Sequence, residues 1–491
     1  MGMRGLIATE GAINLFKSYS DSIWLDYNLA TMPFIVYLPG EWALLHNYPK
    51  QLEEFTHYPE SWPASSSQAL YYDGQLGNLA GQLSFNTNID SIKLAAVPIM
   101  ERSIPELFAF FVHENFHQYQ QYGDYPAFGE IPWEREERYP VEDVRNTALA
   151  YIEMRLAMDA FEAYLSDNRT EVERLLAQFI AVRKHRWSVG DPFIRRYEQG
   201  QEINEGTAAY VEKKSLLIAS RGFANSSHLQ LLDDFNSAMS SFSFTEHLRE
   251  KFNKCLSGGS ISPEDMSRNR IYPLGATLGL LADYLGIDWK TDAQKAGSEF
   301  SLVNPIGVSL GIPESNMGEL LESTLKTYHY KDVLASSEQL IDDYEKGFNT
   351  ELEEFENQDG WRFEITLNAN GVRRARSSTA KKWLIDSGQR ELRSHFNVYS
   401  LKRKGMLFQL HDSGLLEFND WDKHIRTVEF YTPAMDSVVV DGELKSIRNN
   451  ESVAFNILNI KSEGMLLDTS QPGTLTVQDS TIVVDLLNKG K

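Results

Sequence analysis

The sequence has few features that would suggest disulfides, membrane insertion or nucleic-acid binding. Its 491 residues include one cysteine, Cys255, which excludes an intramolecular disulfide and a zinc site built from cysteines. A run of about 18 apolar residues, the length that marks a transmembrane helix, is absent. Acidic residues outnumber basic ones by 69 to 47. The resulting net charge of −22 argues against a nucleic-acid backbone or an anionic membrane surface as partner.

The N-terminus also lacks the features of a targeting segment. Residues 1–16 contain one Arg and no sustained apolar core, unlike a secretory signal. Leu6 stands where N-myristoylation requires Ser or Thr. We therefore expect a cytoplasmic protein, and a chain of this length is able to bury a large core without disulfides.

The periodicity of apolar residues divides the chain into three regions. Residues 1–102 contain short apolar runs such as Pro33–Leu38 and Lys93–Met100, which predict a small β-rich lobe. Helical patterns dominate residues 103–357, and residues 358–491 alternate between apolar and polar again. The predicted fold class is α+β with several domains: the N-terminal lobe, a mainly helical domain, and a C-terminal antiparallel β-sandwich or barrel with an accessory role.

Capping signals mark the starts of several predicted helices. Ser103 and Glu106 form a capping-box pattern, and Thr170 and Glu173 repeat it. Asp191 precedes a proline, which is another helix start. Helices are predicted from Ser103, over Asp143–Ser166 and Asn168–Val189 as a hairpin, from Asp191 to about Ser220, from Pro273, and over 336–357.

The C-terminal region carries strand and turn signals. Trp361, Phe363, Ile365 and Leu367 alternate with polar residues, as in a half-buried strand. Hairpin turns are predicted at Asp412-Ser413-Gly414, Asp441-Gly442 and Gln478-Asp479-Ser480.

The strongest chemical signal is His113-Glu114-Asn115-Phe116-His117, an H-E-x-x-H pattern within a predicted helix. Residues four apart lie on one helix face, so both imidazoles are able to bind one metal ion. Glu114 is then beside the open coordination position, where a carboxylate is a sufficient base for a metal-activated water. The alternative is a pair of histidines that make ordinary hydrogen bonds in a core or an interface. The apolar stripe on which this helix packs consists of Phe108, Phe111, Val112, Phe116 and Tyr119.

A catalytic zinc site needs a third protein ligand. The metzincin pattern would place Gly at position 120 and His at position 123, but the chain has Gln120 and Gly123. The third ligand must therefore come from another part of the sequence.

The segment Ile203–Glu212 reads I-N-E-G-T-A-A-Y-V-E, and with it the chain resembles the gluzincin metallopeptidases. The resemblance is closest to the zinc aminopeptidase branch, whose second motif is N-E-G followed by small residues and an aromatic. It implies a thermolysin-like catalytic domain in which His113, His117 and Glu205 bind one zinc ion. The small residues from Gly206 onward would let their helix pack closely against the H-E-x-x-H helix. Glu202, three residues earlier, is the rival ligand. The alternative is that Glu198, Glu202, Glu205 and Glu212, which share a side, form a solvated helix face without a metal.

The same resemblance implies a role for Tyr272. The aminopeptidase branch has a Tyr-x-x-Gly at a helix start, matched here by Tyr272 and Gly275, and that Tyr stabilises the oxyanion of the tetrahedral intermediate. A phenol is a suitable donor to such a charge, although the residue is one of 22 tyrosines and packing alone is the alternative.

Two features depart from the family. Its exopeptidase motif, G-x-M-E-N, is reduced to Met100-Glu101. The two metal motifs are separated by residues 118–204, which predicts an inserted helical hairpin within about 125–200 that would roof the cleft or limit the size of the substrate.

The sequence therefore predicts a zinc metallopeptidase in which Glu114 is the general base. A peptide or protein substrate is expected to pair with Lys93–Met100 as the edge strand of the N-terminal lobe. Two alternatives remain: a non-peptide amide hydrolase on the same site, and a binding or scaffold protein that retains the motif without catalysis.

Overall fold

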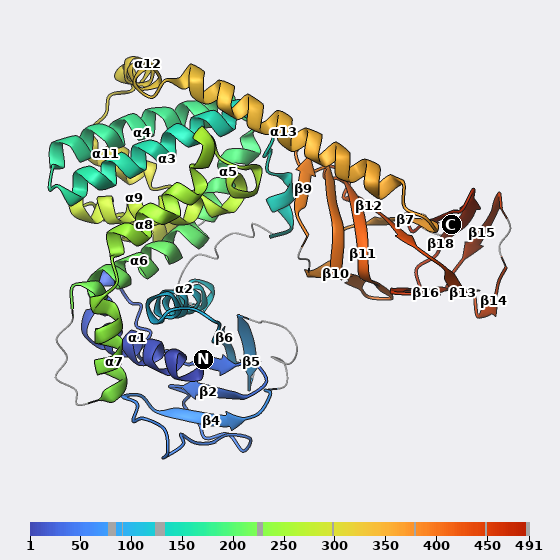
Figure 1. Cartoon of the computed structure of the whole chain (residues 1–491), viewed down its shortest axis with the longest axis horizontal. Coiled ribbons are helices and arrows are strands. Elements are labelled where there is room, and N and C mark those ends of the chain that lie inside the picture. Colours follow the sequence, from blue (N-terminus) through green and yellow to red (C-terminus); the bar gives the residue numbers. More distant parts are fainter. Residues whose placement is uncertain are drawn as a thin grey trace. The chain divides into compact units, whose positions relative to one another are not determined.

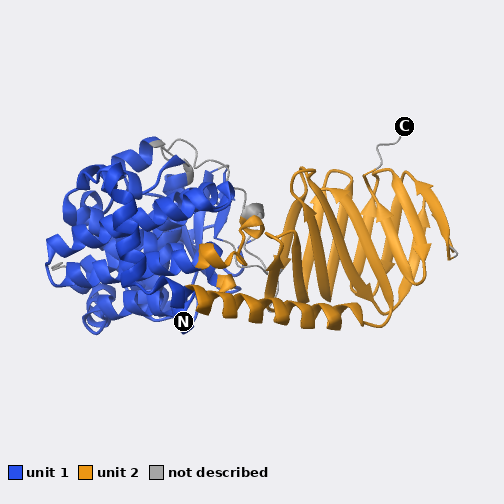
Figure 2. Ribbon diagram, turned by 90° about the horizontal axis from the view of Figure 1, so that it is seen from above, with its two compact units in different colours: residues 1–131, 148–261, 265–333 blue, residues 132–147, 262–264, 334–491 orange. Residues whose placement is uncertain are grey.

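The computed structural model describes residues 1–76, 85–90, 92–122, 133–222, 229–296, 299–377, 380–446 and 449–487. These form an α+β protein with two compact units, coloured blue and orange in Figure 2. Unit 1 comprises Met1–Ile131, Ala148–Ile261 and Asp265–Val333, and unit 2 comprises Pro132–Thr147, Ser262–Glu264 and Leu334–Lys491. The long helix α13 (Tyr330–Glu356) begins in unit 1 and continues into unit 2.

Unit 1 begins with a helix, α1 (Gly2–Ile23), in a region where the sequence predicted only strands. A six-stranded sheet follows in the order β3-β4-β2-β1-β6-β5 (Figure 1). The parallel pair is β1 with β6, and the other pairs are antiparallel. The strands are β1 (Phe34–Leu38), β2 (Trp42–His46), β3 (Thr56–His57), β4 (Ala69–Asp73), β5 (Asn86–Ile89) and β6 (Ile92–Pro98).

The prediction that Lys93–Met100 forms the edge strand is wrong. Strand β6 pairs with β1 on one side and with β5 on the other, so β5 occupies that edge of the sheet. A substrate peptide would meet β5 before it met β6. The expected pairing of a peptide with this strand therefore has no support.

The helical part of unit 1 agrees with most of the predicted starts. Ser103 donates its backbone N–H and its hydroxyl to the Glu106 carboxylate at 2.9 and 2.7 Å, which confirms that capping box. The predicted hairpin is present as α3 and α4, but Asn168 caps α4 by accepting from the N–H of Glu171 at 3.2 Å, and Thr170 lies inside the helix. Residues 123–132 of the expected insertion lie outside the described residues.

The helices after α1 are α2 (Ile104–Tyr122), α3 (Val144–Leu165), α4 (Arg169–Val189), α5 (Pro192–Gln201), α6 (Thr207–Ser220), α7 (Gln230–Ser240), α8 (Phe244–Cys255), α9 (Ile271–Leu285), α10 (Trp289–Ala296), α11 (Val303–Leu310) and α12 (Met317–Thr327). The chain makes a π-helical turn at η3 (Glu202–Gly206) and another at η5 (Asp265–Asn269). These wider turns are frequent at functional sites. None of the described helices has both the length and the hydropathy required to cross a lipid bilayer.

The strands of unit 2 form one sheet that curls into a half-barrel. The main path is β14-β13-β16-β17-β11-β12-β7-β19-β18-β15, and β10 joins β8 and β9 to β11. The path ends at β14 and β15 without closing, so the described strands form neither the predicted sandwich nor a closed barrel. The pairing is antiparallel as expected, except for the parallel pair β19–β7.

Side chains of α13 cover part of this sheet. Tyr344, Phe348 and Phe355 pack with Trp383 and Leu416 in a buried apolar cluster. The strands are β7 (Trp361–Asn368), β8 (Arg373–Ser377), β9 (Lys382–Ile385), β10 (Arg390–Arg403), β11 (Met406–Asp420), β12 (Ile425–Thr432), β13 (Met435–Val440), β14 (Glu443–Leu444), β15 (Glu451–Phe455), β16 (Leu458–Ser462), β17 (Met465–Thr469), β18 (Gly473–Gln478) and β19 (Thr481–Asp485).

Two of the three predicted hairpin turns are present. Asp441 and Gly442 connect β13 to β14 with positive φ angles of 50° and 86°, as a tight hairpin requires. Asp479 and Ser480 likewise connect β18 to β19. The turn predicted at Asp412-Ser413-Gly414 is wrong, because β11 continues through these residues with an irregularity in its pairing with β10.

Candidate metal centre

Helix α2 places His113 and His117 one turn apart on one face. The two Nε2 atoms lie 3.1 Å from each other, and the rings meet edge to face with centroids 4.7 Å apart. His113 is buried and His117 is partly buried. The apolar side chains of the same helix, among them Phe108, Phe111 and Phe116, are buried against the rest of unit 1. The helix therefore packs on one side and directs both imidazoles to a common point.

Glu205 completes the group from the π-helical turn η3. Its Oε2 atom lies 3.3 Å from Nε2 of His113 and 3.5 Å from Nε2 of His117. Glu202, the rival ligand, is directed elsewhere: its carboxylate pairs with Arg183 and accepts from the Ser301 hydroxyl at 2.9 Å. The structure thus brings together His113, His117 and Glu205 as a group able to hold a metal ion.

The spacing of the three donor atoms fits a small tetrahedral cation. Zinc bonds to nitrogen and oxygen at about 2.0–2.2 Å, and the corners of a tetrahedron of that radius lie ~3.3–3.6 Å apart. The three observed separations, 3.1, 3.3 and 3.5 Å, are close to this value. The donors therefore have the arrangement that three protein ligands adopt when the fourth position of a tetrahedral metal is left open.

Hydrogen bonds at the far ring nitrogens fix which nitrogen faces the centre. Nδ1 of His113 donates to Oε2 of Glu212 at 3.1 Å, and Nδ1 of His117 donates to Oε1 of Gln120 at 2.7 Å. The amide nitrogen of Gln120 donates to the carbonyls of Ile203 and Asn204 at 3.0 and 2.9 Å, which orients its oxygen toward the ring. Both Nε2 atoms are consequently available to a metal, as is usual when a histidine ligand is held by an acceptor behind it.

Gln120 was not identified as a site residue from the sequence. It entered only as a mismatch to the metzincin pattern, although a position three residues after His117 lies on the same helix face. Because it also holds the backbone of η3, it ties the histidine helix to the turn that carries Glu205.

Burial and neighbouring charges set the protonation of these side chains. Burial by itself lowers the pKa of His113, but hydrogen bonds and charge interactions with Glu205 and Glu212 outweigh it and raise that pKa to about 10. Burial raises the pKa of Glu205, whereas His117, His113 and Arg268 together hold it well below the usual range. Without a metal, the group therefore carries a proton on His113 opposite an ionised Glu205.

Glu114 lines a cavity of about 650 Å³ together with His113 and Tyr272. Burial raises the pKa of its carboxyl, and charge interactions with His113 and His117 oppose that shift. This is the environment of a carboxylate that exchanges a proton more readily near neutral pH than a solvated one does.

Tyr272 lies in the first turn of α9, with its ring centroid 5.8 Å from that of His113. Burial, followed by the charge of Glu205, raises its pKa, so the phenol keeps its proton and remains a donor. Arg268 stands beside it on η5 and donates to Oε1 of Glu205 at 3.0 Å. Arg268 was not identified from the sequence, because its contact with Glu205 depends on how two π-helical turns meet.

A pair of glycines allows the turn η3 to pack closely against α9. A Cβ atom added to Gly275 would lie 2.5 Å from the Cα of Gly206, closer than two such atoms can be. The sequence predicted that Gly206 would admit the H-E-x-x-H helix. Gly206 itself admits α9, which carries Tyr272, whereas helix α6, which follows Gly206 with its small residues, packs against the H-E-x-x-H helix α2 as expected.

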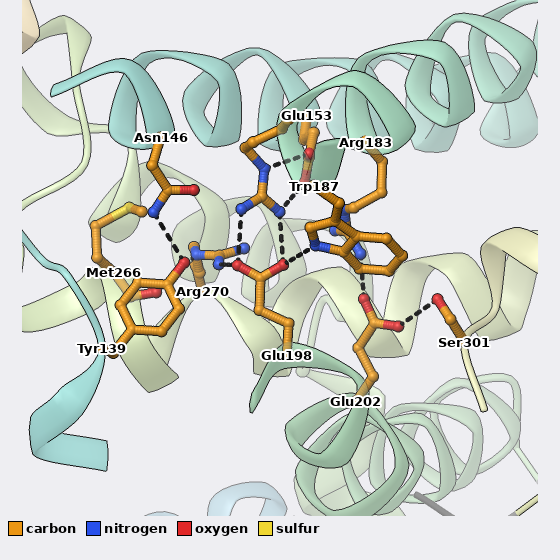
Figure 3. A network of polar contacts seen from close by, with 11 residues as sticks. Tyr139, Asn146, Glu153, Arg183, Trp187, Glu198, Glu202, Met266, Arg270 and Ser301 are labelled. Carbon is orange, nitrogen blue, oxygen red and sulfur yellow. Dashed lines mark hydrogen bonds and ion pairs between the residues drawn. The ribbon is translucent and has the colours of Figure 1, made fainter. Parts of the chain in front are cut away.

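Behind Glu205 lies a buried network of three carboxylates and three guanidinium groups, part of which is shown in Figure 3. Arg186 binds Glu198 in a bidentate manner at 2.8 and 2.6 Å, and Arg270 pairs with the same carboxylate. The six members, each at most 1% exposed, are Glu153, Arg183, Arg186, Glu198, Glu202 and Arg270. The sequence had suggested a solvated helix face for Glu198 and Glu202, and that interpretation is wrong.

This network gives the α3–α4 hairpin a role other than the predicted roof. Glu153 comes from α3, whereas Arg183 and Arg186 come from α4. They hold Glu202 of η3 and Glu198 of α5, the segment that leads into Glu205. The described residues that line the cavity include none from the hairpin. The hairpin therefore supports the metal-binding segment from behind.

Comparison with protein-family models, with curated proteins and with solved structures finds no match for this chain.

Proposed function

We propose that this protein is a zinc-dependent metallopeptidase of the gluzincin type, built on a thermolysin-like catalytic domain. The observation that carries the proposal is the triangle of donor atoms from His113, His117 and Glu205, with sides of 3.1, 3.3 and 3.5 Å. Glu114, next to the first ligand in the sequence, lines the cavity beside this triangle.

The donor set favours zinc. Two imidazoles and one carboxylate form the ligand set of thermolysin-type catalytic zinc sites. A zinc ion bound there would supply Lewis-acid chemistry, since it lowers the pKa of a water and polarises a carbonyl group. The acceptors behind each histidine, Glu212 and Gln120, are the partners that such ligands normally have.

The remaining steps belong to side chains of the chain itself. Glu114 takes the proton of the attacking water and passes it to the leaving amine, for which its raised pKa suits it. Tyr272 donates its hydroxyl to the oxygen on which negative charge develops. Arg268 holds the second oxygen of Glu205, so the carboxylate keeps its orientation.

Replacement of Glu114 by Gln tests this proposal. The variant should retain zinc at the wild-type level, because Glu114 is outside the ligand group, while hydrolysis of a mixed peptide library falls about 10²- to 10⁴-fold. Mass spectrometry of the library identifies the cleaved bonds. A zinc-loaded wild-type protein that cleaves no peptide would contradict the peptidase assignment, and a variant with full activity would contradict the role of Glu114.

A further inference from the structure

The cavity beside the metal centre is rich in positive charge, in contrast to the rest of the chain. The protein carries a net charge of −22. The cationic residues that line this cavity are Arg102, Lys213, Lys251, Lys254 and Arg268. Its carboxylates are Glu106, Glu114 and Glu212. A basic cavity in so acidic a protein attracts anions.

Two of the cations are already neutralised. Lys213 is buried and pairs with Glu212, and Arg268 pairs with Glu205. Lys251 and Lys254 differ: within the described part of the chain, neither forms an ion pair or a hydrogen bond. They lie three residues apart on α8, so both face the same side of that helix.

Arg102 adds a third charge from the segment before α2, and its guanidinium lies over the Phe110 ring at 4.6 Å. The nearby Glu106 is occupied by the capping box of α2, with Ser103. Three cations that are not held in ion pairs therefore surround the cavity, while Glu114 is committed to proton transfer in the proposed function.

The protonation of neighbouring groups agrees with a positive potential. Burial and then the charges of Lys213 and Lys251 lower the pKa of His247 to about 4, although Glu212 and Glu106 act in the opposite direction. Burial and then the charge of Lys213 likewise lower the pKa of Lys251; Glu212 opposes this shift less strongly than Lys213, and Lys254 adds to the lowering. At His247 and Lys251, the charges of the cations therefore affect the pKa more than the charges of the carboxylates do.

We propose that Lys251, Lys254 and Arg102 form a subsite that binds a carboxylate of the substrate, so that the protein prefers peptides with an anionic group close to the scissile bond. The proposal rests on the proposed function, which supplies the peptide substrate and places the reaction at the end of the cavity formed by His113 and Glu114. The carboxylate belongs either to an acidic side chain or to the C-terminus of the peptide. Lysine side chains suit both, because an ammonium is a mobile point charge without the fixed geometry of a guanidinium.

The test uses the zinc-loaded full-length protein and the double variant Lys251→Gln/Lys254→Gln. The substrates are one cleaved peptide in three forms: with Glu near the cleaved bond, with Gln in that place, and with an amidated C-terminus. Lys326→Gln is the matched control, since Lys326 is an exposed lysine on α12 that does not line the cavity.

For the anionic peptide, the double variant should show a KM about five- to twentyfold higher than wild type with little change in kcat, as expected when substrate binding alone is weakened. Added salt should raise the wild-type KM and leave that of the variant nearly unchanged. With wild type, the change that raises KM, either Gln in place of Glu or amidation of the C-terminus, identifies the source of the carboxylate. Equal KM values for all three peptides, or an unchanged KM in the double variant, would overturn the subsite.

The outcome for the subsite remains separate from that for the proposed function. If wild type cleaves none of the peptides, their binding to the Glu114→Gln protein is measured by calorimetry with and without the two lysine substitutions. Binding that weakens five- to twentyfold in the lysine variant supports the subsite even if the hydrolase assignment fails. Binding that does not change contradicts it.

Discussion

Replacement of Glu198 by Gln should destabilise unit 1 strongly. The Glu198 carboxylate is fully buried and accepts from Arg186 twice, from Trp187 at 2.7 Å and from Arg270. Glutamine keeps one acceptor oxygen, but its NH₂ group would face N–H donors in place of the other oxygen. Two charge-assisted hydrogen bonds, at about 1.5–3 kcal/mol each, would be lost. Three guanidinium groups would then face two carboxylates.

The two hydrogen bonds together amount to about 3–6 kcal/mol, and breaking a buried ion pair from one side typically costs about 3–5 kcal/mol, so we expect a loss of about 3–5 kcal/mol. The free energy of unfolding in urea, followed by tryptophan fluorescence, measures this loss. The matched control is Glu171→Gln on α4, which removes an exposed carboxylate paired with Arg174 and should cost at most about 1 kcal/mol. If the two variants lose equal stability, the network does not support the metal-binding segment in the way described.

Two further predictions concern the metal centre and its packing. Because the pKa of His113 is raised to about 10, a metal ion must displace a proton from the site at neutral pH. The apparent affinity for zinc should therefore rise about tenfold per pH unit from pH 6 to 8. Calorimetry in two buffers should detect the release of about one proton, and a pH-independent affinity would contradict this prediction. Gly275→Ala should weaken both the fold and metal binding, since its methyl would collide with Gly206. Gly318→Ala, in open space on α12, should instead stabilise by about 0.4–1 kcal/mol, and equal effects of the two would contradict the packing argument.

The elements that the sequence predicted well are those specified by local signals. Ser103, Asn168 and Asp191 lie at helix starts because short polar side chains accept hydrogen bonds from the first turn. The alternation of apolar and polar residues over Trp361–Leu367, which is also a local signal, correctly predicted strand β7. His113 and His117 lie close together because a helix places residues four apart on the same face.

The elements that it missed depend on tertiary packing. Helix α1 contains Gly5 and Gly11 and has no side-chain cap, so its local propensity is poor. Yet those glycines allow close contact: a Cβ at either position would lie 2.3 Å from an atom of Ile99 or of Phe235. Strand order is equally non-local, which is why β6 was mistaken for an edge.

The supporting residues of the candidate site were missed for the same reason. Glu198 and Glu202 share a helix side with Glu205 in sequence, so they resembled a solvated face. Their partners Arg183 and Arg186 lie on α4, beyond the reach of any local pattern. The π-helical turn at η3 also cannot be predicted from spacing. Within it, Glu202 and Glu205 point to different partners although they are only three residues apart.

Metal content is the most direct test of the central claim. Elemental analysis of purified protein, loaded with zinc and freed of excess, should give one zinc per chain for wild type and for His57→Ala, which changes an exposed histidine on β3. His117→Ala and Glu205→Ala should each bind less than a tenth of an equivalent under the same conditions, because each removes one of the three donors. Wild-type protein without bound zinc, or equal zinc in wild type and the two ligand variants, would contradict the account.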